Sequence, residues 1–161
     1  MLKRFGLLLA LVLTVSLSVG CAKNVTPEPA QPQVDAAAEA AAAAERAVKV
    51  VADGVVYFDF DKYDIKEEFR AILNEKAEIL KAYPQMRVRI EGNCDARGTQ
   101  EYNLALGERR ALAAYEYLVM LGVNPSQLEV ISYGKENPAV AGNTFEAWAK
   151  NRRDNFRVVA R

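Results

Sequence analysis

The stretch Met86–Gly122, which reads MRVRIEGNCDARGTQEYNLALGERRALAAYEYLVMLG, decides the fold of this chain. Apolar and charged residues alternate from Met86 to Glu91, and this pattern predicts a strand with one buried and one exposed face. A loop bounded by glycines, Gly92–Gly98, follows the strand. The segment from about Glu101 to Leu121 then predicts a helix that ends at Gly122. A strand, a short loop and a long helix therefore come in immediate succession.

Two opposite charges stand out within this stretch, Asp95 in the loop and Arg110 on the helix. Asn103, Leu106 and Arg110 fall at i, i+3 and i+7 and so share one helix face. Because helical side chains lean toward the helix N-terminus, we expect Arg110 to point back toward Asp95. A carboxylate and a planar two-pronged guanidinium would together hold a zwitterion that carries an ammonium beside a carboxylate. Taken singly, an aspartate in a glycine loop is more often explained by turn geometry.

The flanking segments complete the predicted order of elements. β-branched and aromatic residues at Val55–Phe60 predict a buried strand. A capping box formed by Asp64 and Glu67 predicts the start of a helix that stops near Pro84. The remaining expected elements are a strand at Leu128–Tyr133, a short helix at Phe145–Arg153 and a last strand at Phe156–Ala160. The fold class is therefore α+β, a βαβαβ(α)β sandwich in which a mixed sheet carries its helices on one face.

Composition excludes several classes of function. The 161 residues contain 21 Lys and Arg against 21 Asp and Glu, so the chain lacks the basic surface that nucleic acid requires. It contains no histidine, the commonest general base and metal ligand. It has no Gly-x-Ser-x-Gly elbow and no zinc ligand set. We therefore expect no enzyme activity, no metal and no cofactor.

The amino terminus has the pattern of an export signal. Lys3 and Arg4 precede the apolar stretch Leu7–Val15, which is too short to span a membrane comfortably. Small residues then lead to Cys21, a pattern that resembles the lipobox of bacterial lipoproteins. We expect a signal peptide at residues 1–20 and lipidation of Cys21, and an ordinary secretory signal is the alternative. By the same resemblance, Ala22 after the cysteine favours transfer to the outer membrane, where the acyl chains would anchor the protein.

Residues 21–52 are rich in proline and alanine and form a predicted tether, so the folded domain is expected at residues 53–161. The chain has only two cysteines, and lipidation of Cys21 would prevent a disulfide with Cys94. Cys94 is then a free thiol beside Asp95. We expect it to pack as a small apolar group in the ligand site, with a redox or catalytic role as the alternative.

Several motifs appear together in one order. They are Phe58-Asp59-Phe60-Asp61, Glu91-Gly92-Asn93-Cys94-Asp95-Ala96-Arg97-Gly98-Thr99, Glu101-Tyr102-Asn103-Leu104-Ala105-Leu106-Gly107-Glu108-Arg109-Arg110-Ala111, Ser132-Tyr133-Gly134 and Asn151-Arg152-Arg153. With the lipoprotein signal before them, they resemble the peptidoglycan-associated lipoproteins (Pal) of the OmpA-like domain family. The resemblance covers nearly all of Val55–Arg161.

The resemblance implies particular site residues. Asp95 matches the aspartate that receives the ammonium of diaminopimelate, the amino acid of the peptidoglycan stem, and Arg110 matches the arginine that receives its carboxylate. Asn103 and Leu106 match positions of the same pocket, and Phe60 and Asp61 match the loop that contributes backbone contacts. Many relatives have Gly-His-x-Asp, whereas this chain has Gly92-Asn93-Cys94-Asp95, so a titrating histidine is replaced by asparagine. The roles of Asn151, Arg152 and Arg153 stay open.

The function implied is that of a lipid-anchored protein of the outer membrane that faces the periplasm. It would bind the diaminopimelate-containing stem of peptidoglycan without a covalent bond and tie the outer membrane to the wall. Family members also act with the Tol proteins, notably TolB, in envelope integrity and cell division. The alternative is a periplasmic adaptor whose Asp95–Arg110 groove docks a peptide of a partner protein.

Overall fold

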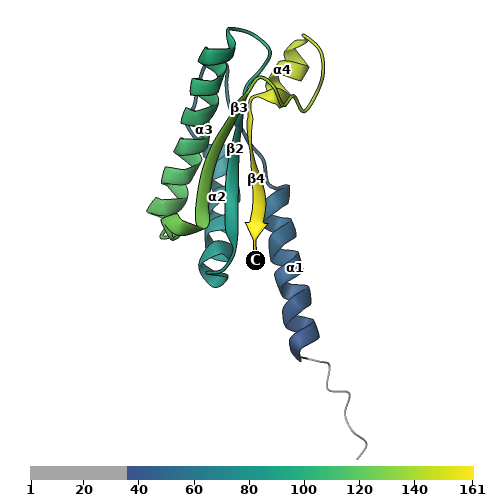
Figure 1. The fold of residues 1–161 in the computed structure, drawn as a ribbon, viewed down its shortest axis with the longest axis vertical. Helices are drawn as coiled ribbons and strands as arrows, with labels where there is room; N and C mark the ends of the chain where they lie inside the picture. The colour runs from purple at the N-terminus through teal and green to yellow at the C-terminus, as the bar shows by residue number, and fades with distance from the viewer. Residues whose placement is uncertain (1–35) are drawn as a thin grey trace, which may run out of the picture. The chain divides into compact units, whose positions relative to one another are not determined.

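The computed structural model describes residues 36–161. Its elements are α1 (Ala36–Asp53), β1 (Val56–Tyr57), α2 (Glu67–Ala82), β2 (Arg87–Asn93), α3 (Gln100–Met120), a 3-10 turn at Pro125–Gln127, β3 (Leu128–Gly134), α4 (Phe145–Asn151) and β4 (Arg153–Ala160) (Figure 1). The predicted signal peptide, Cys21 and the proline-rich part of the tether lie outside the described residues.

The four strands form one mixed sheet in the order β1-β4-β2-β3. β2 and β3 are parallel and are joined through α3, whereas β4 is antiparallel to both β1 and β2. Helices α2 and α3 cover one face of the sheet (Figure 1). The core between them contains side chains such as Leu73, Leu80, Val88, Ile90 and Leu118, all less than 1% exposed. The predicted α+β fold with its mixed sheet is confirmed.

The first strand and the start of the first core helix differ from the prediction. Only Val56 and Tyr57 belong to β1, and the backbone N–H of Phe58 donates to the carbonyl of Arg152 just before β4 begins (3.0 Å). α2 begins at Glu67, and Lys66 at its cap makes no side-chain capping bond. The predicted Asp64–Glu67 capping box is therefore wrong by two residues: the cap is Lys66, and Asp64 lies in the loop.

The folded unit begins earlier than the predicted boundary at residue 53. α1 is helical over most of the alanine-rich part of the predicted tether, and Ala47 and Val51, one turn apart, are buried in the core. The ammonium of Lys76, itself 1% exposed, donates to the carbonyl groups of Val50 and Val51 at the end of α1. A cation suits the negative end of a helix. The last turns of α1 are therefore docked, beside β4 (Figure 1).

α3 lies unusually close to β2, and two glycines allow this. A Cβ atom added to Gly92 on β2 would lie 1.9 Å from the backbone oxygen of Gly107 on α3. A Cβ on Gly107 would in turn lie 2.3 Å from the hydroxyl of Ser132. The contact holds the first half of α3 against the end of β2, so that the side chains of this half meet the loop that follows β2.

Candidate functional site

A pocket of about 180 Å³ opens where β2 ends and α3 begins. It is lined by residues from the β1–α2 loop, the β2–α3 loop, α3 and the turn after α4: Phe60, Asp61, Cys94, Asp95, Arg97, Gly98, Tyr102, Asn103, Leu106, Arg110 and Arg152. All seven residues that the sequence analysis named for the ligand, Phe60, Asp61, Cys94, Asp95, Asn103, Leu106 and Arg110, belong to this lining. The structure thus brings them together, and their role in binding stays a prediction.

The loop that carries Asp95 is held by the start of α3. Thr99 caps the helix by accepting a hydrogen bond from the backbone of Tyr102 (3.2 Å). The side-chain amide of Asn103 donates back to the carbonyls of Arg97 (2.7 Å) and Thr99 (2.8 Å). Asn103 is 3% exposed, so its amide hydrogens serve the loop. In this structure Asn103 shapes the pocket wall and fixes the position of the Asp95 loop.

Asp95 is buried and accepts four hydrogen bonds. Its Oδ1 accepts from the backbone (3.1 Å) and Nε (3.0 Å) of Arg97, and its Oδ2 accepts from Nη2 of Arg97 (2.6 Å) and Nη1 of Arg152 (3.2 Å). Burial by itself raises the pKa of Asp95, but the hydrogen bonds from Arg97 and Arg152 outweigh it and hold the pKa below its usual value. Asp95 is therefore a carboxylate at neutral pH.

Arg110 is fully buried and is bonded mainly to backbone. Its Nε donates to the carbonyl of Lys62 (2.9 Å), Nη1 to the carbonyl of Asn93 (2.9 Å) and to Sγ of Cys94 (3.4 Å), and Nη2 to the carbonyl of Asp59 (3.3 Å). A guanidinium has five N–H donors. Four are engaged, so the expected free two-pronged donor is not what the structure shows, and one N–H is left for a ligand. Arg110 of α3 thus ties the β1–α2 loop to the end of β2 at the base of the pocket.

Cys94 is 3% exposed, and its thiol donates to the carbonyl of Asn103 (3.3 Å). Burial raises the pKa of this thiol to about 11, and the nearby Arg110 opposes the shift only in part. The thiol is therefore protonated at neutral pH, and a thiol in that state is a poor nucleophile. Cys94 is buried, as the sequence predicts, but its sulfur also takes part in hydrogen bonds with Asn103 and Arg110.

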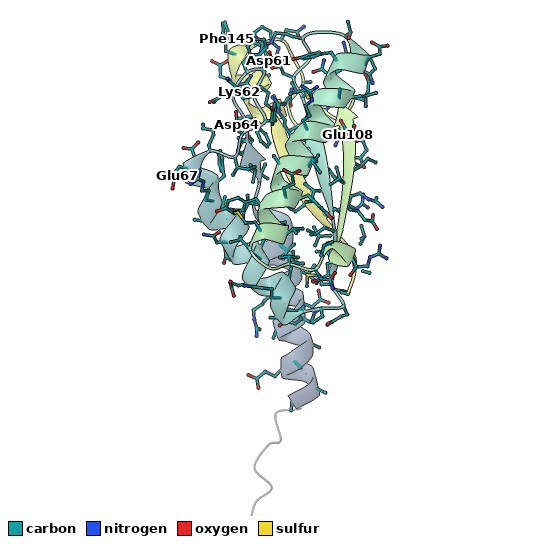
Figure 2. All side chains as sticks on the ribbon, turned by 90° about the vertical axis from the view of Figure 1, so that its left-hand side faces the viewer. Asp61, Lys62, Asp64, Glu67, Glu108 and Phe145 are labelled. Carbon is teal, nitrogen blue, oxygen red and sulfur yellow. The ribbon has the colours of Figure 1, made fainter. Side chains whose placement is uncertain are left out.

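The upper rim of the pocket comes from the β1–α2 loop. Asp61 has a left-handed backbone (φ 58°), which is uncommon for a residue with a side chain, and its carboxylate accepts a hydrogen bond from the hydroxyl of Tyr102. Figure 2 shows Asp61 and Lys62 of this loop at the same end of the molecule as Phe145 of α4. The rim thus joins the β1–α2 loop to α3 across the pocket.

Two arginines of the pocket, Arg97 and Arg152, were not predicted to belong to the ligand site. Arg97 follows Asp95 by two positions, a spacing that could have signalled a contact within the loop. Arg152 is 57 positions away and gave no local signal. Its neighbours in the motif are structural, because Asn151 bonds both the N–H (2.9 Å) and the carbonyl (2.8 Å) of Val140, and Arg153 donates to the carbonyl of Asn137 (3.2 Å).

Asp154 is a buried carboxyl group next to this site. It is 0% exposed, and neither of its carboxyl oxygens has a hydrogen-bond partner in the described part of the chain. Burial raises the pKa of Asp154 well above its ordinary value, and the charge of Arg110 opposes this only partly. The folded protein therefore retains a proton on Asp154 that the unfolded chain releases.

This proton makes stability depend on pH. An unfolded aspartate loses its proton near pH 4, so the contribution of Asp154 to stability falls as pH rises above about 4. We expect Asp154→Asn to raise the free energy of unfolding at pH 7 by about 1–2 kcal/mol and to flatten the pH dependence. Urea unfolding followed by circular dichroism between pH 4 and pH 8 measures both. A variant that is less stable at pH 7 would instead mean that Asp154 is an ionised partner of Arg110.

No group of three or more His, Cys, Asp and Glu side chains within residues 36–161 is placed to bind a metal ion. Among the helices of the same range, none combines the length and the apolar character needed to cross a membrane.

The fold and the sequence match one family. The model of the OmpA family matches residues 57–152. Among solved structures, the C-terminal domain of MotB from Helicobacter pylori superposes with a TM-score of 0.62 at 24% identity, over 66% of this chain and 84% of that one, a likeness of fold. The peptidoglycan-associated lipoprotein from Burkholderia pseudomallei superposes with a TM-score of 0.66 at 45% identity, over 68% of this chain and 92% of that one.

Relatives of similar length narrow the family assignment further. The chain is 41% identical to the peptidoglycan-associated lipoprotein of Pseudomonas putida, over 96% of this chain and 97% of the relative. It is 42% identical to the protein of the same name from Pseudomonas aeruginosa, over 93% of this chain and 95% of the relative. The chain therefore belongs to the OmpA family and, within that family, to the peptidoglycan-associated lipoproteins.

Proposed function

We propose that this protein binds the diaminopimelate-containing stem of peptidoglycan noncovalently and so ties the outer membrane to the cell wall. The observation that carries the proposal is the pocket that combines the buried, ionised Asp95 with the buried cation of Arg110. The name of the relatives supports a role at peptidoglycan. Exposed ion pairs contribute little, whereas a pocket that excludes water strengthens both charge contacts.

The pocket offers a distinct group for each part of such a ligand. The ammonium of diaminopimelate would approach the carboxylate of Asp95. Its carboxylate would take the remaining N–H of Arg110 at the base of the pocket. The methylene groups between them would lie against the apolar side chains of Leu106 and Phe60, which belong to the same lining. A ligand with both charges would therefore match the pocket better than a ligand with one.

A comparison of two stem peptides tests this function. Calorimetry with the full-length lipoprotein in detergent would use a tripeptide that ends in meso-diaminopimelate and the same tripeptide with lysine in that position. Lysine has the ammonium and lacks the second carboxylate, so Arg110 would keep an unused donor in a partly dry site. We expect the diaminopimelate peptide to bind at least roughly tenfold more tightly. Equal affinities would contradict the proposal and favour a groove that docks a partner peptide.

We also propose a cellular location and protein partners that are typical of this family. Lipidation of Cys21, with Ala22 after it, would anchor the protein in the outer membrane facing the periplasm, and TolB with the other Tol proteins would be its protein partners. Many anchored copies that face one polymer give strong total adhesion from modest single-site affinity. The role would be mechanical and without catalysis, in keeping with relatives that are named as lipoproteins.

A further inference from the structure

The carboxylate of Asp95, which should receive the ligand's ammonium, is already saturated. A carboxylate offers about four acceptor positions. Arg97 fills three of them, through its backbone N–H, Nε and Nη2, and Arg152 fills the fourth. An ammonium can therefore bind Asp95 only if one of these donors leaves.

The two arginines are not equally free to leave. The side chain of Arg152 is 15% exposed, and its Nε also donates to the carbonyl of Phe58 (2.9 Å). Its backbone is fixed as well, since its carbonyl accepts from Phe58. The side chain of Arg97 is 34% exposed, and within residues 36–161 its guanidinium donates hydrogen bonds to Asp95 alone. Arg97 is therefore the donor that can be displaced.

The guanidinium of Arg97 lies in a site suited to a cation. Its Cζ is 4.0 Å from the ring centroid of Phe60 and 4.2 Å from that of Trp148. Trp148 is supported in turn by an edge-to-face contact with Phe145 (5.2 Å between centroids). Two aromatic faces and a carboxylate attract an organic cation through the ring quadrupoles and the negative charge. The group that occupies this site in the free protein is the protein's own side chain.

We propose that Arg97 is a displaceable latch: in the free protein it occupies the ammonium site formed by Asp95, Phe60 and Trp148, and it swings out when the ligand's ammonium enters. This inference depends on the proposed function, because the entering ammonium is that of diaminopimelate. Gly98, with φ 82°, follows Arg97 directly and gives the backbone a conformation that residues with side chains rarely adopt. Arg97 is a positioning residue that occupies the ammonium site until the ligand arrives, while Arg152 continues to hold the carboxylate of Asp95.

The latch has a consequence for affinity. Binding exchanges one cation at Asp95 for another, so the ligand gains only the difference between the two contacts. Loss of the latch should therefore strengthen binding, which is the opposite of what removal of an ordinary ligand contact does. A merely structural role for Arg97 predicts weaker binding or none, because a disturbed loop would misplace Asp95.

The test measures affinity for the meso-diaminopimelate tripeptide in full-length Arg97→Met and Arg97→Lys proteins. Methionine keeps an unbranched stem but is shorter and removes the charge and the donors, so we expect roughly fivefold tighter binding than in the wild type. Lysine keeps a cation without the planar fork and should give an intermediate affinity. Arg87→Met is the control, because Arg87 is exposed, pairs with Glu129 (2.9 Å) and lies outside the pocket.

A second measurement uses the wild-type protein and does not depend on the folding of a variant. In the free protein the Nε–H of Arg97 is hydrogen-bonded, so its nitrogen-15-labelled NMR signal should be shifted and slow to exchange with water. Addition of the tripeptide should move this signal toward that of a solvated arginine. Binding without any change in the Arg97 signal, or weaker binding by a folded Arg97→Met protein, would overturn the latch. A wild-type protein that does not bind the tripeptide would refute the proposed function instead.

Discussion

Replacement of Arg110 with methionine is expected to lower the free energy of unfolding by about 3 kcal/mol. Methionine fills much of the same volume, but it leaves the carbonyl groups of Asp59, Lys62 and Asn93 without the donors they have in the structure. Each unsatisfied buried polar group costs on the order of 1–3 kcal/mol, and partial relaxation of the loops reduces the sum. The midpoint of urea unfolding, followed by circular dichroism, measures the loss.

The adjacent residue provides a matched control for this experiment. Arg109 has the same side chain on the same helix and is exposed. Arg109→Met should change stability by less than about 0.5 kcal/mol. If the two variants unfold at the same urea concentration, the carbonyl contacts of Arg110 do not hold the β1–α2 loop to the end of β2, and the base of the pocket would need another explanation.

Replacement of Asp95 with asparagine is expected to weaken binding of isolated peptidoglycan sacculi by at least roughly thirtyfold. The substitution preserves shape but removes the buried carboxylate that would face the ligand's ammonium. Asp61, the other acidic residue of the lining, is exposed and accepts a hydrogen bond from Tyr102. The substitution also leaves the positive charges of Arg97 and Arg152 without a carboxylate partner. These two charges then repel the ligand's ammonium. Co-sedimentation of the full-length protein with sacculi and calorimetry with the diaminopimelate tripeptide both report the change.

Asp64→Asn is the control for Asp95, since Asp64 is an exposed carboxylate in the β1–α2 loop and does not line the pocket. It should bind sacculi as the wild type does. Unchanged binding by a folded Asp95→Asn protein would remove the basis of the proposed function. Asp95→Asn should weaken binding and Arg97→Met should strengthen it. This contrast distinguishes the role of Asp95, which receives the ammonium, from the role of Arg97, which the ammonium displaces.

The order of elements and the approach of Arg110 to the Asp95 loop could be predicted from short-range patterns, whereas Phe60 and Asp61 were assigned to the pocket through the family resemblance. The alternation at the start of β2 and the spacing of Asn103, Leu106 and Arg110 are each set within a few residues. The loop that carries Asp95 is then brought to this helix face by direct succession along the chain.

Contacts between distant segments could not be predicted in the same way. The docking of α1 depends on Lys76 of α2, and the state of Arg110 depends on carbonyl groups some 50 positions away, at Asp59 and Lys62. Arg152 reaches Asp95 only because β4 pairs with β2. Hydrogen bonds from a side chain to the backbone of a distant segment produce no pattern in the sequence. The prediction that the guanidinium of Arg110 is free to bind a ligand with two N–H groups was therefore wrong.

The docked end of α1 changes how load would enter this protein. If the protein is anchored through Cys21 as proposed, a pull on that anchor would reach α1 before the sheet, and Ala47, Val51 and the Lys76 contacts would resist it. β1 is held by only two residue pairs and would be peeled away easily if it carried that strain directly. α1 would therefore take the load first. Its release from the core would lengthen the connection between the anchor and the folded domain before the sheet is disturbed.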